Sequence, residues 1–217
     1  GKDLGGIAPG KLADILVFDD LKSFKPNKVF VGGKLVVSNG QIITSIKKQM
    51  ISPWIKKTVK LKNFSKNDFE IKSKKKDVTA NTIYMQTEII TKLGSAELQT
   101  KDGHVSASLD SDIWKVAAFD RIHGTGKHSI GFLENFGADI GAFASTWSFH
   151  ENDMIVIGSN DSDMAIASNH LIKNQGGLVV VKSGKIIASL PLQFGGIIST
   201  DSFQKVSTNF ENINFAI

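Results

Sequence analysis

Residues 153–176 read DMIVIGSNDSDMAIASNHLIKNQG, a pattern typical of a buried strand, a polar loop and a helix. The strand is expected over residues 153–158, and we expect it to be buried. A helix follows, because apolar side chains then recur at helical spacing, at Met164, Ala167 and Leu171. This strand–loop–helix unit predicts a domain that combines strands and helices.

The polar residues between this strand and this helix are expected to cap the helix. Asn160 or Asp161 can accept the free backbone N–H groups at its start, and Gly176 can take the left-handed conformation that ends it. The alternating oxygens of residues 160–163 also suggest a calcium loop, but the remaining ligands and the distal Glu of such a loop are missing. Helix capping is therefore the preferred interpretation.

Further strands are expected on both sides of this unit. Downstream, residues 178–181 and 185–190 are predicted to form a hairpin, since Ser183-Gly184 between them suits a tight turn. Upstream, β-branched and apolar runs occur at residues 82–84, 89–91 and 114–119. We therefore predict an α+β domain over residues 81–217, with a largely antiparallel or mixed sheet.

The first 46 residues are predicted to form a small β unit. Strands are expected at residues 13–18, 28–31 and 34–38, and Gly32-Gly33 accepts the positive φ angles of a hairpin turn between the last two. A unit of about 40 residues buries too little apolar surface to be stable alone. We therefore expect it to add to a sheet whose other strands lie elsewhere.

Residues 47–80 are polar and basic, and we expect a linker or an arm packed along a larger body, with Pro53-Trp54 as its apolar anchor. Residues 1–77 hold 17 of the 26 Lys and Arg residues but only 7 of the 21 Asp and Glu residues. These lysines are scattered among Asn, Ser and Asp, with no arginine to grip phosphate or bases. No nucleic acid partner is therefore expected.

The composition predicts a globular, soluble chain. Of its 217 residues, 41% are apolar, and no apolar run approaches the ~20 residues that cross a bilayer. The N-terminus has no signal-peptide pattern and the chain has no cysteine, so we expect a cytoplasmic protein without disulfides or thiolate metal ligands. The opening Gly1-Lys2-Asp3 is typical of a mid-chain segment, and we expect that an upstream segment is missing.

Two sets of motifs resemble a known family. Gly6–Phe18 followed by Val29–Lys34 is similar to the C-terminal signature of the amidohydrolase superfamily, in which the chain leaves a metal-binding (β/α)8 barrel to complete a small β-sandwich. Five later blocks resemble, in order and spacing, the C-terminal domain peculiar to adenine deaminases: Phe119–Gly126, Gly141–Thr146, Ile155–Met164, Gly176–Val181 and Ala188–Leu192. The chain thus resembles the C-terminal portion of an adenine deaminase that lacks the barrel.

This resemblance implies both an architecture and a function. Residues 1–46 would be the C-terminal part of the composite β-sandwich, and residues 81–217 the family's α+β C-terminal domain. The intact enzyme would hydrolyse adenine to hypoxanthine and ammonia in purine salvage, with a divalent metal, Mn or Fe, held by the missing barrel. The fragment alone is expected to bind no catalytic metal and to be inactive. Expected partners are its own N-terminal barrel portion, adenine and further copies in a homo-oligomer, with no membrane partner.

One segment departs from the family pattern. Between Ser145 and Gly158, adenine deaminases carry two histidines that flank Asp-Ser. An ungapped alignment places Phe149 and Asn152 at the two histidine positions, whereas a one-residue shift lets His150 replace one of the histidines. His150, Glu151 and Asp153 belong to the densest group of potential proton carriers and ligands, and we predict that they are catalytic. The alternative is an ordinary polar turn.

A second candidate site is the loop at residues 120–126. Its glycines permit close backbone approach, and we predict that Asp120, Arg121 and His123 bind substrate. The alternative is a salt-bridged strand end with a turn. The isolated histidines are expected to be surface or structural residues, namely His104, His128 and His170.

Two other functions stay open on the sequence. One is a non-catalytic module, produced by truncation, that binds a partner or a purine. The other keeps the superfamily and changes the substrate to another cyclic amidine or amide.

Overall fold

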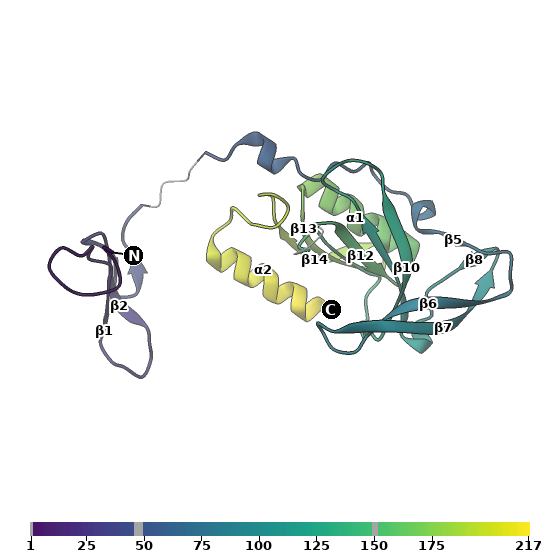
Figure 1. Ribbon diagram of the computed structural model, residues 1–217, viewed down its shortest axis with the longest axis horizontal. Coiled ribbons are helices and arrows are strands. Elements are labelled where there is room, and N and C mark those ends of the chain that lie inside the picture. The colour runs from purple at the N-terminus through teal and green to yellow at the C-terminus, as the bar shows by residue number, and fades with distance from the viewer. Residues whose placement is uncertain (1, 46–49, 149–151) are drawn as a thin grey trace. The chain divides into compact units, whose positions relative to one another are not determined.

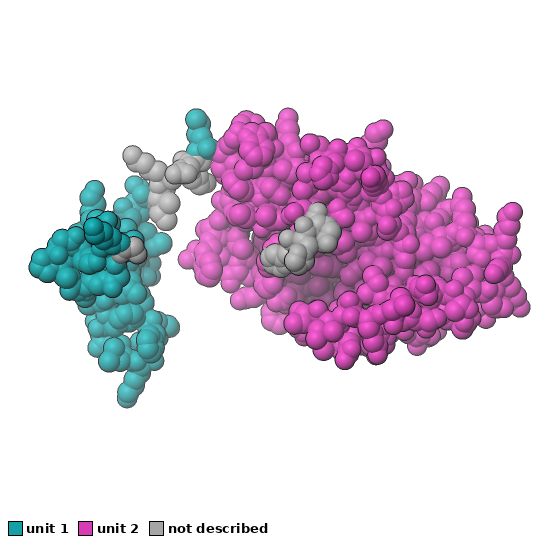
Figure 2. All heavy atoms as spheres, viewed as in Figure 1, with its two compact units in different colours: residues 1–50 teal, residues 51–217 magenta. Residues whose placement is uncertain are grey.

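The computed structural model describes residues 2–45, 50–148 and 152–217 (Figure 1). Its contacts divide the chain into two compact units, residues 1–50 and residues 51–217, which Figure 2 colours separately. The first unit contains a four-stranded sheet, and the second contains a ten-stranded sheet and both α-helices. The predicted α+β class is confirmed.

The first unit is an antiparallel sheet in which neighbours along the chain pair with one another. Its strands are β1 (Ile15–Phe18), β2 (Pro26–Val31), β3 (Lys34–Ser38) and β4 (Gln41–Ile42). The predicted hairpin is present: Val31 pairs with Lys34, and Gly32 and Gly33 between them have φ angles of 53° and 79°. Both glycines thus take the conformation that a two-residue turn needs.

This first sheet has apolar residues on both faces and no core of its own. Leu16 pairs with Val29, whereas Ile15, which points to the opposite face, pairs with Phe30. None of the described residues from 2 to 45 is buried, and Leu16 is 56% exposed. Burial inside the unit therefore cannot account for its apolar side chains.

The second unit is built on one long mixed sheet. Its strand order is β14-β13-β11-β12-β9-β10-β6-β7-β8-β5. Neighbouring strands are antiparallel throughout except for β10 and β6, which run parallel. The strands are β5 (Ile71–Lys72), β6 (Asp77–Met85), β7 (Thr91–Lys101), β8 (His104–Val105), β9 (Ile113–Phe119), β10 (His128–Glu134), β11 (Ala142–Ser145), β12 (Met154–Gly158), β13 (Gly177–Lys182) and β14 (Lys185–Pro191).

The two helices pack on opposite faces of this sheet. Helix α1 (Asp161–Asn174) shares a buried cluster with Val179 and Val181, and α2 (Phe203–Ala216) shares another with Val180. Successive side chains of a strand point to opposite faces, so β13 is apolar almost throughout. The described residues also form three short 3₁₀ turns, at Pro53–Lys56, Lys66–Phe69 and Leu109–Ser111.

The caps of α1 agree with the sequence at its start and differ at its end. The Asn160 carboxamide oxygen accepts a hydrogen bond from the backbone N–H of Asp163 at 2.9 Å. At the other end the left-handed cap is Gln175, with φ 59°, one residue before the predicted Gly176, which also has a positive φ, of 121°. Gly176 donates its backbone N–H to the carbonyl of Leu171 at 2.9 Å.

The anchor of the basic segment is also different from the one expected. From residue 51 onward this segment belongs to the second unit. Trp54 is 70% exposed, so the prediction that Pro53-Trp54 anchors it is wrong. Phe69 is fully buried and packs with Phe64 and Phe119. An aromatic cluster below α1 therefore holds the segment in place.

A buried cation ties the start of α1 to the sheet. Lys115 of β9 is 2% exposed, and its ammonium donates to both carboxylate oxygens of Asp161, at 2.7 and 3.0 Å, and to the carbonyl of Phe69 at 3.0 Å. Asp161 is thus an ion-pair partner, and Asp163 accepts the backbone N–H of Gly184 at 2.9 Å. These contacts engage the carboxylates that suggested a calcium loop.

None of the described helices has the length and apolar content that a bilayer span requires.

We predict that Asp161→Asn destabilises the second unit by about 2–3 kcal/mol, because it leaves the buried Lys115 ammonium without a counter-charge. Asp139→Asn is the matched control: Asp139 also contacts a lysine at 2.7 Å, but both side chains of that pair with Lys182 are exposed. We expect it to cost less than about 1 kcal/mol in urea unfolding. Equal losses for the two variants would contradict the role given to the buried pair.

We also predict that backbone amides of β1–β4 exchange with solvent far faster than those of β13 in the 217-residue chain. The reason is that no described residue of the first sheet is buried, whereas Val179, Val180 and Val181 are fully buried. Hydrogen exchange followed by mass spectrometry measures the difference. Comparable protection of the two sheets would show that the first unit is stable alone.

Candidate functional site

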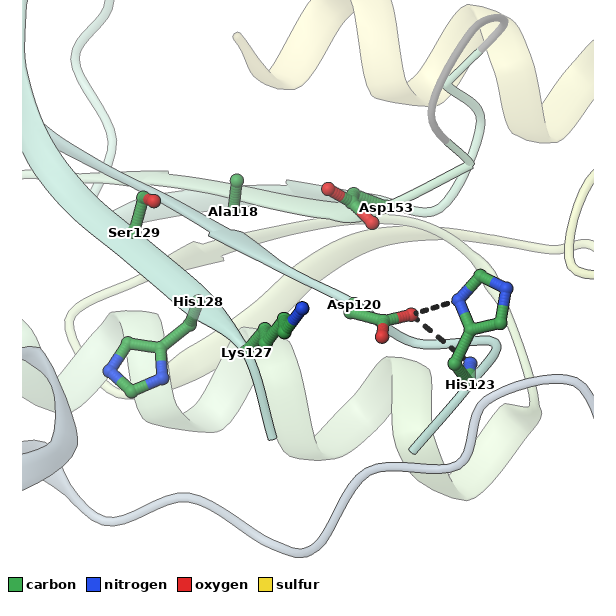
Figure 3. Close-up of a pocket in the computed structure, with 7 residues that line it drawn as sticks. All are labelled: Ala118, Asp120, His123, Lys127, His128, Ser129 and Asp153. Atoms are coloured by element: carbon green, nitrogen blue, oxygen red, sulfur yellow. Dashed lines mark hydrogen bonds and ion pairs between the residues drawn. The ribbon is translucent and has the colours of Figure 1, made fainter. Parts of the chain in front are cut away.

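The candidate site lies where three strands of the large sheet end together. Phe119, the last residue of β9, pairs with His128 of β10 on one side and with Met154 of β12 on the other. The residues just beyond these ends therefore meet around one open pocket of about 520 Å³ (Figure 3). Its lining residues are Ala118, Asp120, His123, Lys127, His128, Ser129 and Asp153.

Asp120 organises the loop that borders this pocket. One carboxylate oxygen accepts the Thr125 hydroxyl at 2.6 Å, and the other accepts the backbone N–H of His123 at 3.1 Å and its imidazole Nδ1 at 2.9 Å. These donors, the Thr125 hydroxyl first, hold the pKa of Asp120 far below its usual range. The carboxylate therefore stays ionised at neutral pH.

His123 takes its orientation from this carboxylate. An ionised carboxylate only accepts hydrogen bonds, so the Nδ1 atom of His123 carries a proton toward Asp120. The His123 side chain is 75% exposed, and Figure 3 shows its ring at the rim of the pocket. The Nε2 atom of His123 can thus form a hydrogen bond with a group other than Asp120.

Arg121, which the sequence groups with these two residues, lies elsewhere. It is 1% exposed, and its guanidinium donates to the Thr58 hydroxyl and to the backbone carbonyls of Gly195 and Thr146, at 3.2, 3.2 and 3.4 Å. Burial lowers the pKa of Arg121, while the charge of Asp153 raises it. The structure therefore makes Arg121 an interior tie between three segments and not part of the pocket lining.

The surroundings of Arg121 leave no spare room. Gly196 has a φ of 77°, which favours glycine, and a Cβ atom there would lie 2.6 Å from one guanidinium nitrogen and would displace Arg121. The Nε atom of Arg121 has no acceptor among the described residues. Within the part of the chain that the structure describes, the acceptors of the guanidinium are neutral oxygens, which fix its position.

Only one of the three predicted catalytic residues can be placed. Asp153 lines the pocket, and Asn152 before it has a left-handed φ of 57°. His150 and Glu151 lie outside the described residues, as does Phe149. The structure thus brings Asp153 to the same pocket as Asp120 and His123.

The sequence did not place Lys127, His128 and Ser129 at this site. His128 was expected to be an isolated surface or structural residue, and it lies beside the pocket because β10 begins opposite the end of β9. Its ring stacks on Phe119 with 5.6 Å between centroids, and its Nδ1 lies 3.0 Å from the carbonyl of Gly126. The glycine-containing turn between two apolar runs was the signal that could have predicted this pairing.

An apolar groove of about 450 Å³ adjoins the pocket and shares Ala118 and Ser129 with it. Its side chains include Val116 and Ile155. Gly131 also lines it, and a Cβ there would meet nothing within 4 Å. The polar pocket therefore borders an apolar groove on the sheet.

The sequence of this chain is similar to those of one known protein family. The family model described as adenine deaminase C-terminal domain matches residues 88–217. An adenine deaminase of Cenarchaeum symbiosum is 51% identical over 212 residues, which are 98% of this chain and 35% of that protein. Adenine deaminases of Clostridium botulinum and Desulforamulus reducens are 36% and 34% identical, over 99% and 97% of this chain and 36% of each relative. The chain therefore spans little more than a third of these relatives.

We predict that Thr125→Val raises the pKa of Asp120 toward its usual range, because it removes the strongest of the hydrogen bonds that lower it. A lowered carboxyl pKa favours the folded state above the unfolded-state pKa, and this contribution is lost as the pH falls through the folded-state pKa. The variant should therefore lose its loop structure at a higher pH during acid titration. Carbon-detected NMR of the Asp120 carboxyl follows both effects.

The matched control for this experiment is Thr79→Val, since the Thr79 hydroxyl also donates to a carboxylate at 2.6 Å, that of Glu97. It should leave the titration of Asp120 unchanged. An Asp120 titration that is the same in Thr125→Val and in the wild type would contradict the assigned cause.

Proposed function

The chain belongs to the adenine deaminase C-terminal domain family, and we propose that it forms the C-terminal portion of an enzyme that hydrolyses adenine to hypoxanthine and ammonia in purine salvage. The observation that carries this proposal is that relatives named adenine deaminase match nearly the whole chain with only about a third of their own length. The remaining two thirds of those relatives have no counterpart here. We propose that this portion carries the reaction centre.

The donor set of the described residues does not fit a catalytic metal ion. Residues 2–45, 50–148 and 152–217 contain no group of three or more His, Asp or Glu side chains that could hold one. The pocket has two carboxylates, but Asp120 is already engaged by His123 and Thr125. We propose that a divalent ion, Mn or Fe, is held by a preceding barrel, where it would supply the hydroxide for the attack on adenine.

The contribution of this chain would then come from the pocket at the ends of β9, β10 and β12. Asp120 and His123 offer a fixed carboxylate–imidazole pair, and Asp153, just before β12, offers a second carboxylate. The His123 side chain is exposed in this chain, as expected of a residue on a surface that the barrel covers in the intact protein. We propose that Asp120, His123 and Asp153 face the substrate there, together with His150 and Glu151.

The first unit would serve the same assembly. Its apolar side chains lie on both faces of a single sheet without any buried residue among those described, which favours a sheet completed by other parts of the enzyme. We propose that these are the first strands of the intact protein and the barrel beside them. A homo-oligomer in the cytoplasm, without nucleic acid or membrane partners, completes the proposal.

We predict that the intact protein, with the preceding portion present, releases ammonia from adenine in buffer with added Mn or Fe, and that the 217-residue chain alone does not. The reason is that the proposed hydroxide source lies outside this chain. An ammonia assay run on both proteins measures the difference, and hypoxanthine formation confirms the product. Ammonia release at the same rate by both would place the reaction in this chain and contradict the proposal.

The same assay distinguishes the substrate from its alternatives. An intact protein that is inactive on adenine but hydrolyses another cyclic amidine or amide would keep the chemistry and overturn the substrate. An intact protein inactive on all of them would favour a non-catalytic module.

A further inference from the structure

The feature with the clearest chemical meaning is the imidazole that a carboxylate holds at the rim of the pocket. The Nδ1 atom of His123 lies 2.9 Å from an oxygen of Asp120, and Figure 3 shows the ring seated beside that carboxylate. The Nδ1 side is occupied, so exchange of a proton is left to Nε2. A carboxylate that orients an imidazole in this way fixes which of its two ring nitrogens faces away from the carboxylate.

The pair is mounted on a rigid base. The Asp120 backbone N–H donates to the carbonyl of Lys127 at 3.0 Å, which closes the loop on itself. The next residue, Arg121, is buried, and its carbonyl accepts the backbone N–H of Lys60 at 2.6 Å. His123 therefore stands two residues from a fixed interior anchor. Such preorganisation is what a group that must meet a reacting atom requires.

The other charged groups around the pocket do not form a comparable pair. Lys127, His128 and Asp153 line it, and Lys60 lies against Gly124 of the same loop. The Nδ1 of His128 lies near a neutral carbonyl, that of Gly126. Among the residues that line the pocket, His123 is the imidazole held by a carboxylate.

From this arrangement we propose that His123 is a catalytic residue that protonates the amino group leaving the substrate, with Asp120 as its positioning residue. This inference rests on the proposed deaminase function. It assigns to this chain the proton transfer to the leaving amino group. The substrate class is an amino-substituted aromatic amidine whose leaving nitrogen meets Nε2 of His123.

The proposed step balances without a further reactant. Water adds its oxygen to the ring carbon that bears the amino group, and the bond from that carbon to the amino nitrogen breaks. The leaving nitrogen takes a proton from Nε2 of the His123 imidazolium and departs as ammonia. One proton of the water replaces the proton that His123 gave, and the other stays on the product ring. Nothing is oxidised or reduced.

The test uses the intact enzyme and the variants His123→Ala and Asp120→Asn. We expect His123→Ala to lower kcat on adenine by about 100-fold while KM changes less than about threefold, because the proton is needed in the transition state. Added imidazole should restore much of the lost kcat, since removal of the His123 ring leaves a space of the size of imidazole beside the Asp120 carboxylate. Asp120→Asn should lose less, and imidazole should not restore it.

The matched control is His104→Ala. His104 also lies near a carboxylate, with Nδ1 3.6 Å from Glu70, but it belongs to β8 near the far end of the sheet. This variant should keep the wild-type kcat and show no response to imidazole. A His123→Ala enzyme with kcat within about threefold of the wild type, or one that imidazole does not restore, would overturn the proposal.

An NMR measurement separates failure of this inference from failure of the proposed function. In the 217-residue chain, ¹⁵N shifts of the neutral His123 ring should report a proton on Nδ1, and Asp120→Asn should abolish that preference. A wild-type intact enzyme that is inactive on adenine, with the Nδ1 preference present, would refute the function and leave the pair intact. Absence of the Nδ1 preference would refute the pair itself, whatever the activity of the enzyme.

Discussion

The pairing of β9 with a different strand on each side is the constraint on which the candidate site depends. The backbone of Phe119 is bonded in register to His128 on one side and to Met154 on the other, although these residues lie 9 and 35 positions away in the chain. Register is strongly specified wherever a face of the sheet is buried, since a shift of one residue would move every side chain of the strand to the other face. The position of Asp153 beside the Asp120 loop is thus fixed by the same hydrogen bonds that build the core. A functional site at such a point inherits the rigidity of the sheet.

Two buried cations near this strand are stabilised in different ways, and the difference follows from their chemistry. The Lys115 ammonium is a compact charge that meets a carboxylate and a carbonyl, and it joins the start of α1 to the sheet. The Arg121 guanidinium spreads its charge over a planar group and binds three neutral oxygens from three segments. The first is a local clamp between helix and strand. The second ties the loop of Asp120 and His123 to Thr146, which lies at the start of the connection from β11 to β12.

The two units differ in how their apolar side chains are accommodated. The large sheet has α1 on one face and α2 on the other, and this burial is enough for β13 to be apolar on both sides. The small sheet has apolar residues on both faces and no covering layer among its own described residues. Together with coverage of only about a third of its relatives, this contrast is what a part of a larger enzyme would present. The proposed role of the chain, to support and complete a reaction centre held elsewhere, follows from that contrast.

The sequence by itself determined the local elements. The strand at residues 153–158, the Asn160 cap and the Gly32-Gly33 hairpin were all predicted, because each depends on side chains only a few positions apart. Helix α2 was not predicted. It is stabilised by packing on a face of the large sheet, and the sequence does not reveal which segment covers that face. The end of α1 at Gln175 was also missed, because a non-glycine residue takes the left-handed conformation there.

Only the tertiary structure decided which members of the predicted sites lie together. Asp120 and Arg121 are neighbours in the chain and were expected to act together, yet the first borders the pocket and the second is buried beneath Gly196. Both residues lie at the turn that follows β9, and the partners that bury the Arg121 side chain come from distant positions, residues 58, 146 and 195. His128 likewise joins the site through a contact between separate segments, the pairing of β10 with β9. Contacts between distant segments carry this information, and local sequence patterns do not.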